Sequence, residues 1–139
     1  MKRLKWVKWA LLCVVTVACA QQRFETGEMK GFTKSPTEHI VERLDDQVPV
    51  RRVEGIVTSK SLSKPLAGVL VEIRGPGADE KVTSAVTDRN GRFKFRKLPE
   101  GDYAIKITSN GFRSVFGRVS VQPSAKQSRP LRIELLHGV

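Results

Sequence analysis

Cysteine and histidine are scarce in this chain of 139 residues, which has two of each. Cys13 and Cys19 both lie among the first 20 residues, and His39 and His137 are far apart, so no ligand spacing typical of a zinc site is present. No Walker loop and no Ser/His/Asp triad can be identified either. The sequence therefore predicts no catalytic, cofactor-binding or metal-binding residues, and we expect a protein that is not an enzyme.

Aromatic and acidic residues are also few. The chain has one Tyr, two Trp and 14 Asp+Glu against 25 Lys+Arg, which gives a formal charge of +11. Both Trp6 and Trp9 lie near the N-terminus, so little aromatic surface remains for stacking against sugars or bases. Because single-stranded nucleic acid is bound on exposed aromatic side chains as well as on basic residues, the charge alone does not indicate a nucleic-acid partner.

The first 20 residues have the pattern of a cleaved export signal. Residues 1–8 are basic, and residues 9–20 (WALLCVVTVACA) form an uncharged apolar run that ends in small side chains. This run of 12 residues is shorter than the roughly 20 that span a bilayer as a helix. We therefore expect export without a permanent membrane span.

Two cleavage sites compete in this leader. Ala18-Cys19-Ala20 before Gln21 fits ordinary signal peptidase, which would leave a periplasmic or secreted chain. Thr16-Val17-Ala18-Cys19 instead resembles a bacterial lipoprotein box, in which Cys19 becomes the lipidated first residue of an outer-membrane lipoprotein. In that case the lipid anchor would be the chain's membrane attachment.

Residues 21–52 are polar and weakly acidic, which is typical of a tether. Within them Ser35, Pro36 and Glu38 form a helix-start signal and are followed by three apolar residues at helical spacing. This predicts a short helix over residues 36–46. A flexible spacer with one transient helical turn explains the same residues equally well.

From Val53 onward apolar and polar residues alternate, broken by Gly, Pro, Asn and Asp, which is typical of short β-strands. Strands that bury one face each close most economically as two packed sheets. The sequence predicts an all-β domain over residues 53–139, a seven-stranded antiparallel β-sandwich of immunoglobulin-like, Greek-key type. The expected strands are residues 52–59, 68–74, 81–88, 92–96, 102–108, 113–121 and 130–136.

An ordered series of turns and apolar positions runs through this domain, strongest in residues 87–95 (TDRNGRFKF) and continued in residues 98–103 (LPEGDY). This series resembles the carboxypeptidase regulatory-like domain, a transthyretin- or prealbumin-like sandwich. The resemblance implies a non-catalytic module without cofactors, attached to many different proteins. It also implies structural roles for its motif residues: Asp88 caps a turn, Gly91 takes a left-handed conformation, and Tyr103 buries its ring. The motif residues are Gly55, Pro65, Gly68, Thr87, Asp88, Gly91, Phe93, Phe95, Leu98, Gly101 and Tyr103.

Three basic residues are the candidate binding residues of the domain. Arg92, Lys94 and Arg96 alternate with the inward-facing Phe93 and Phe95, so they share one face. Such a pattern is more often a solvated strand face that keeps the protein soluble; the functional alternative is a face that binds an anionic component of the cell envelope. An envelope protein is the other expected partner. The alternative function is an accessory or inhibitory domain that regulates a separately encoded envelope enzyme such as a peptidase.

Overall fold

The computed structural model of the chain describes residues 29–34, 41–44, 48–76, 81–96, 98–125 and 129–138. The expected leader, with Cys19, lies outside these residues. The described part contains strands and no helix, which confirms the all-β prediction. The strands are β1 (Val41–Arg43), β2 (Val48–Val50), β3 (Glu54–Ser59), β4 (Leu70–Arg74), β5 (Val82–Val86), β6 (Arg92–Lys94), β7 (Gly101–Thr108), β8 (Ser114–Val121) and β9 (Leu131–Leu135).

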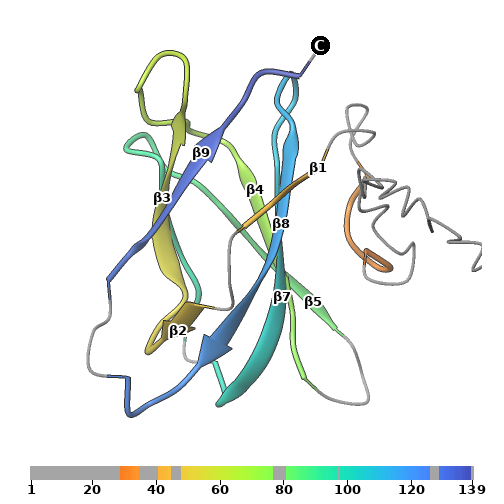
Figure 1. Ribbon diagram of the computed structural model, residues 1–139, viewed down its shortest axis with the longest axis vertical. Helices are drawn as coiled ribbons and strands as arrows, with labels where there is room; N and C mark the ends of the chain where they lie inside the picture. Colours follow the sequence, from red (N-terminus) through yellow and green to blue (C-terminus); the bar gives the residue numbers. More distant parts are fainter. Residues whose placement is uncertain are drawn as a thin grey trace, which may run out of the picture.

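The strands form two sheets that pack face to face (Figure 1). The larger sheet has the order β1-β8-β7-β4-β5, with β2 also paired to β8, and the smaller sheet has the order β6-β3-β9. Strands β3 to β9 correspond to the seven predicted strands, so the sandwich is confirmed.

The prediction of purely antiparallel pairing is wrong, because β9 pairs parallel with β3 and both β1 and β2 pair parallel with β8. The parallel β3/β9 pair has a topological cause. After β3 the chain forms β4 and β5 of the larger sheet, then β6 of the smaller sheet, then β7 and β8 of the larger sheet. Only then does it return as β9, beside β3 and in the same direction.

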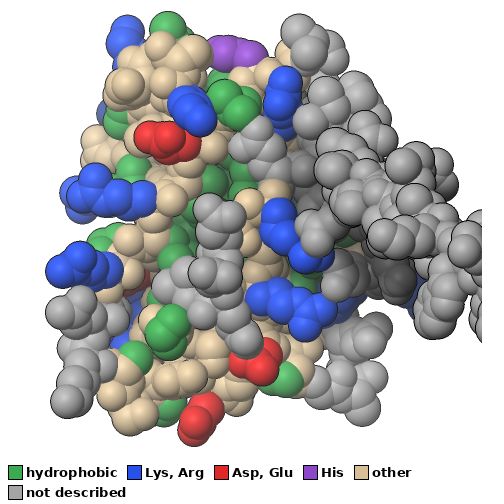
Figure 2. All heavy atoms as spheres, in the orientation of Figure 1, with side chains coloured by type: hydrophobic (Ala, Val, Ile, Leu, Met, Phe, Trp, Pro, Cys, Tyr) green, Lys and Arg blue, Asp and Glu red, His purple; other side chains and the backbone are tan. Residues whose placement is uncertain are grey.

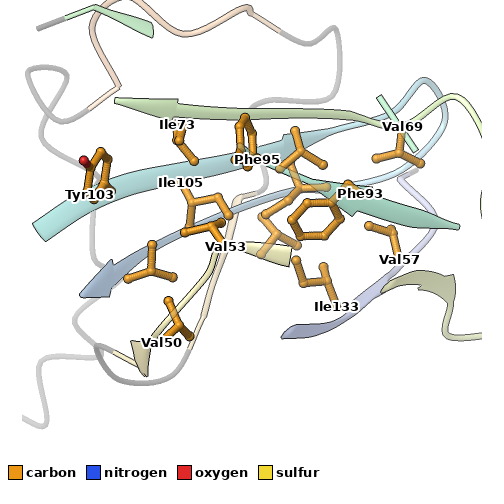
Figure 3. Packing of buried hydrophobic residues seen from close by; sticks show 14 of the residues in the cluster. Val50, Val53, Val57, Val69, Ile73, Phe93, Phe95, Tyr103, Ile105 and Ile133 are labelled. Atoms are coloured by element: carbon orange, nitrogen blue, oxygen red, sulfur yellow. The ribbon is translucent and has the colours of Figure 1, made fainter. Parts of the chain in front are cut away.

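The hydrophobic core lies between the two sheets (Figure 3). The predicted inward-facing side chains of β4, β6, β7 and β9 are buried or half-buried, because successive side chains of a strand point to opposite sides and one set reaches the core. Phe93 and Phe95 contact each other edge to face, with ring centroids 6.3 Å apart. Fully or almost fully buried residues from both sheets surround this pair: Val57, Val69, Val71, Ile73, Ile105, Ile107, Val119, Ile133 and Leu135.

Part of the expected tether belongs to the folded domain. β1 and β2 lie along the edge of β8, and Val50 is buried in the core. The predicted helix over residues 36–46 is wrong where the structure describes it, because Val41–Arg43 is a strand; residues 36–40, 45 and 46 lie outside the described residues. The physical reason is that β8 would otherwise leave a row of unpaired backbone groups, which β1 and β2 satisfy.

A second part of the expected tether, residues 29–34, covers the outer face of the larger sheet, away from the core. We call it the N-terminal strap. Phe32 is 6% exposed and meets the ring of Phe116 on β8 edge to face, at 6.0 Å between centroids. The guanidinium of Arg74 on β4 lies 5.1 Å from the centroid of the Phe32 ring. The larger sheet is therefore covered on both sides in this region.

The strap also holds two charged side chains that are buried beneath it. Glu72 and Lys106 are cross-strand neighbours on β4 and β7, and they are 5% and 0% exposed. The Lys106 ammonium donates a hydrogen bond of 2.6 Å to the carbonyl oxygen of Thr33. The backbone N–H and hydroxyl of Thr33 donate to the Glu72 carboxylate, the hydroxyl at 2.8 Å. One strap residue thus satisfies both buried charges.

Candidate anion-binding groove

The motif residues that carry the family resemblance build turns. Oδ1 of Asp88 accepts hydrogen bonds from the backbone N–H groups of Asn90 and Arg92, at 2.8 and 2.9 Å. Gly91 has φ +71°, a left-handed conformation that L side chains rarely adopt. A Cβ atom on Gly91 would lie 2.5 Å from the carbonyl oxygen of Val57, so this position also needs the small size of glycine.

Two further motif residues fix loops through side-chain hydrogen bonds. The hydroxyl of Thr87 donates to the carbonyl oxygen of Leu66 at 2.6 Å and accepts from the N–H of Val69 at 2.9 Å. The hydroxyl of Tyr103 donates to the carbonyl oxygen of Pro99 at 2.8 Å, and burial raises the pKa of this phenol. These contacts are structural and involve no group arranged for catalysis.

The predicted basic residues Arg92, Lys94 and Arg96 are all exposed. Their surroundings differ because the smaller sheet brings other strands beside them. Arg92 is paired with Ile56 of β3, whereas Lys94 is paired with the acidic Glu54. On the side of the molecule in Figure 2, Lys and Arg side chains are spread over the surface, with hydrophobic and acidic side chains between them.

Lys94 and Arg96 line a groove of about 760 Å³ together with Arg51 and Arg52. We call it the Arg52 groove. Its remaining lining is apolar and consists of Val53, Phe95, Leu98, Pro99, Val121 and Pro123. No carboxylate is among these lining residues, so all charged side chains of the groove are positive.

Arg92 does not line the Arg52 groove. It lines a separate cleft of about 500 Å³, which also contains the acidic residues Glu54 and Asp88. The structure therefore separates the three predicted residues. Of the two spaces, Arg96 lines only the Arg52 groove and Arg92 lines only the cleft with carboxylates, which lower the local positive potential. Lys94 lines both spaces and is paired with Glu54.

Sequence reasoning missed Arg51 and Arg52, which are more than 40 positions from Arg96. The backbone N–H of Phe95 donates to the carbonyl oxygen of Val53 at 2.9 Å, which continues the antiparallel β3/β6 register toward Arg52 and Arg96. Nη2 of Arg51 donates to the carbonyl oxygen of Ala125 at 3.0 Å, which holds it over the turn after β8. The signal for this grouping was the Arg51-Arg52 pair directly before the first strand of the sandwich.

A second basic groove of about 750 Å³ lies between β8 and β9. We call it the Arg132 groove. Its charged lining residues are Arg118, Arg129 and Arg132, and its apolar ones are Leu44, Val119, Pro130, Leu131 and Ile133. Val119 and Val121 are the β8 partners of Val48 and Val50, so the two grooves lie toward opposite ends of β2.

The described residues contain neither a candidate metal cluster nor a candidate membrane helix. Among them, no three His, Cys, Asp or Glu side chains come together in a group that could hold a metal ion. In the same part of the chain, no helix has the length and apolar character needed to cross a membrane.

A family model provides the decisive comparison. The model of the carboxypeptidase regulatory-like domain matches residues 52–136, more than half of the chain. The chain belongs to the carboxypeptidase regulatory-like domain family. The resemblance carried by the Thr87 to Phe95 motif and by the Leu98 to Tyr103 motif is thereby confirmed. The match begins at Arg52, directly before β3, and ends just after β9.

Curated relatives share part of this domain. The mouse protein BOS complex subunit NOMO1 is 46% identical over 56 residues, which cover 40% of this chain and 5% of that protein. The human BOS complex subunit NOMO3 is 43% identical over 56 residues, with the same coverage. The match therefore spans about a twentieth of the length of these relatives.

Solved structures of similar shape include 3-chlorocatechol 1,2-dioxygenase from Rhodococcus opacus, with a TM-score of 0.46 and 14% identity over 76% of this chain and 69% of that one. A candidate carbohydrate-binding protein from Pseudomonas aeruginosa has a TM-score of 0.42 and 20% identity over 66% of this chain and 91% of that one. Because identities and TM-scores are this low, nothing about function follows from either structure.

Proposed function

We propose that this chain is an exported, non-catalytic interaction module whose sandwich binds an anionic component of the cell envelope. Family membership supports the modular character, because the family is that of a regulatory-like domain. The motif residues support it as well, since they cap turns and fill the core. The leader pattern of residues 1–20 supports export.

The Arg52 groove carries this proposal. Four basic side chains converge on one concave surface, and none of its lining residues can neutralise them. Clefts lined by charge of one sign concentrate counter-ions and speed the association of an oppositely charged partner. An anionic partner is therefore favoured over a neutral one.

The test is the binding of a soluble polyanion, such as polyphosphate, at about 10 mM and about 150 mM salt. The affinity should fall steeply, because the Debye length shortens from about 30 Å to about 8 Å over this range. Arg96→Ala should weaken binding, whereas Arg92→Ala, which removes the same charge from the cleft with carboxylates, should have a smaller effect. Salt-independent binding, or equal effects of the two substitutions, would contradict the proposal.

We propose two alternative cellular locations for the protein, and one measurement distinguishes them. A lipidated Cys19 would make the protein an outer-membrane lipoprotein, and a free Gln21 terminus would make it periplasmic or secreted. The intact mass of the processed chain from a Gram-negative host distinguishes them, because acylation of Cys19 adds the mass of a lipid. A mass that includes the uncleaved leader would contradict both forms.

A protein partner is the second candidate, favoured because the curated relatives are subunits of a complex. In this role the domain would be an accessory or inhibitory subunit of a separately encoded envelope enzyme. Crosslinking in the native envelope should then yield one stoichiometric protein partner. Its retention by the Arg96→Ala variant would show that the contact is made outside the Arg52 groove.

A further inference from the structure

We infer that the two arginine-lined grooves bind the anionic phospholipid surface of a membrane directly. In this arrangement basic side chains contact the lipid phosphates, and apolar groove residues contact the adjoining glycerol and acyl carbons. The inference rests on the proposed function and narrows its anionic partner to an amphiphile. It goes beyond attachment through Cys19, because the contact is made by the folded domain.

The Arg52 groove brings like charges together, which destabilises the free protein. The β3/β6 register, continued by the Phe95 to Val53 hydrogen bond, directs Arg52 and Arg96 toward the same place, and like charges that face each other across strands are destabilising. A phosphate between them removes this repulsion, and guanidinium groups bind phosphate oxygens through two parallel hydrogen bonds. Both side chains are exposed and accessible to such a ligand.

The same groove also has an apolar part that favours a ligand with carbon chains. Pro99 and Pro123 are exposed, and Leu98 is half-buried, so apolar surface lies directly beside the four basic residues. A fully hydrophilic polyanion would cover this surface without gaining from it, whereas a phospholipid has carbon chains next to its phosphate. Burial of apolar area from such chains is favourable at roughly 25 cal/mol per Å².

The Arg132 groove likewise combines basic side chains with apolar surface. Exposed Arg129 and Arg132 lie beside the exposed Pro130, again without a carboxylate among the lining residues. A ligand that presents many phosphates gains overall affinity from each further groove that it reaches, without new kinds of contact. A membrane is such a ligand.

The experiment uses the chain from Gln21 to Val139, so that no lipid anchor contributes. Its binding to vesicles that contain phosphatidylglycerol is compared with its binding to vesicles of phosphatidylcholine alone, by co-sedimentation. We expect binding to the anionic vesicles only. Arg52→Ala with Arg96→Ala should weaken it about 30-fold, because each basic residue beside an anionic membrane contributes roughly fivefold. Arg129→Ala with Arg132→Ala should weaken it by a similar factor.

The matched control removes two charges elsewhere. Lys60 and Lys64 are exposed and lie just beyond the far end of β3, about 25 Å from Arg52, because a strand rises roughly 3.3 Å per residue and the backbone N–H of Ser59 donates to the carbonyl oxygen of Lys64. Lys60→Ala with Lys64→Ala should leave vesicle binding within about twofold of the original. If the control weakens binding as much as the groove variants do, attraction depends on net charge and the inference is overturned.

A second variant separates lipid from soluble polyanion. Pro123→Ser keeps every charge but replaces one exposed apolar residue of the Arg52 groove with a polar one. It should therefore weaken binding to anionic vesicles and leave polyphosphate binding unchanged. If polyphosphate binds and vesicles do not, the inference is wrong while the proposed function stands. If neither binds, both are wrong. Thermal unfolding of each variant verifies that the sandwich is intact.

Discussion

Gly91 and Gly111 form a matched pair for testing how the Asp88 to Gly91 turn supports the fold. Both have a left-handed backbone, with φ +71° and +79°. Alanine at either position carries the strain of that conformation, which costs about 1 to 2 kcal/mol. The two differ in their surroundings, because a Cβ on Gly111 has no heavy atom within 4 Å, whereas one on Gly91 meets backbone.

The additional loss in the free energy of unfolding expected for Gly91→Ala comes from contact with β3 and with the connection that follows it. The added Cβ would lie 2.5 Å from the oxygen of Val57 and 3.1 Å from Cβ of Pro65. Val57 cannot retreat easily, because its N–H donates to the oxygen of Gly91 and its oxygen accepts from Leu66. Forcing a backbone shift in a packed core costs typically about 1 to 3 kcal/mol. Gly91→Ala should therefore destabilise the domain by about 2 to 5 kcal/mol, against about 1 to 2 for Gly111→Ala.

Urea unfolding followed by far-ultraviolet circular dichroism measures both free energies. In a domain of this size a difference of 1 kcal/mol also moves the melting temperature by about 4 to 8 °C, so thermal scans give a second reading. Equal losses at the two glycines would refute the reasoning, because they would mean that contact with Val57 adds nothing. A larger loss at Gly111 would refute it as well.

Three other substitutions test separate contacts. Thr87→Val leaves the N–H of Val69 and the carbonyl of Leu66 without this hydroxyl and should cost about 1 to 3 kcal/mol in urea unfolding, most of which Thr87→Ser should restore. Phe32→Ala should loosen the N-terminal strap, so that the fully buried Lys106 ammonium reacts faster with an acylating reagent; an unchanged rate would contradict the strap's protective role. Because burial raises the pKa of Tyr103, its contribution to stability is complete below the usual tyrosine pKa and declines as pH rises through the folded value. Tyr103→Phe should remove that alkaline loss, and a loss that persists in the variant would contradict this cause.

The seven strands of the sandwich were predictable because apolar and polar residues alternate along them, a pattern that is present within each segment. Phe93 and Phe95 are a direct case: their spacing alone places both in the core. β1 and β2 were not predictable in this way, because each has only three residues. Their pairing depends on the unsatisfied edge of β8, which is distant in sequence, and this edge outweighed the helical spacing of Val41 and Leu44.

The candidate site was predictable only in part, for a similar reason. Alternation correctly places Arg92, Lys94 and Arg96 on the exposed side of the chain. It does not indicate which of them lie beside Glu54 and which beside Arg52, because that depends on register and on side chains from other segments. Lys106 shows the same limit: its strand position indicates a solvent-facing side chain, and the strap buries it completely.

If Cys19 is lipidated, the N-terminal strap limits how far the sandwich can lie from the bilayer. Without the strap, the 22 residues from Cys19 to Val41 at the start of β1 could extend to about 75 Å, whereas the 10 residues from Cys19 to Met29 extend to about 35 Å at most. With the strap in place, a lipidated chain would hold its domain within about one domain diameter of the bilayer. The contacts of Phe32 and Thr33 would thus reduce, by about half, the greatest distance at which a lipidated chain can hold its domain from the membrane.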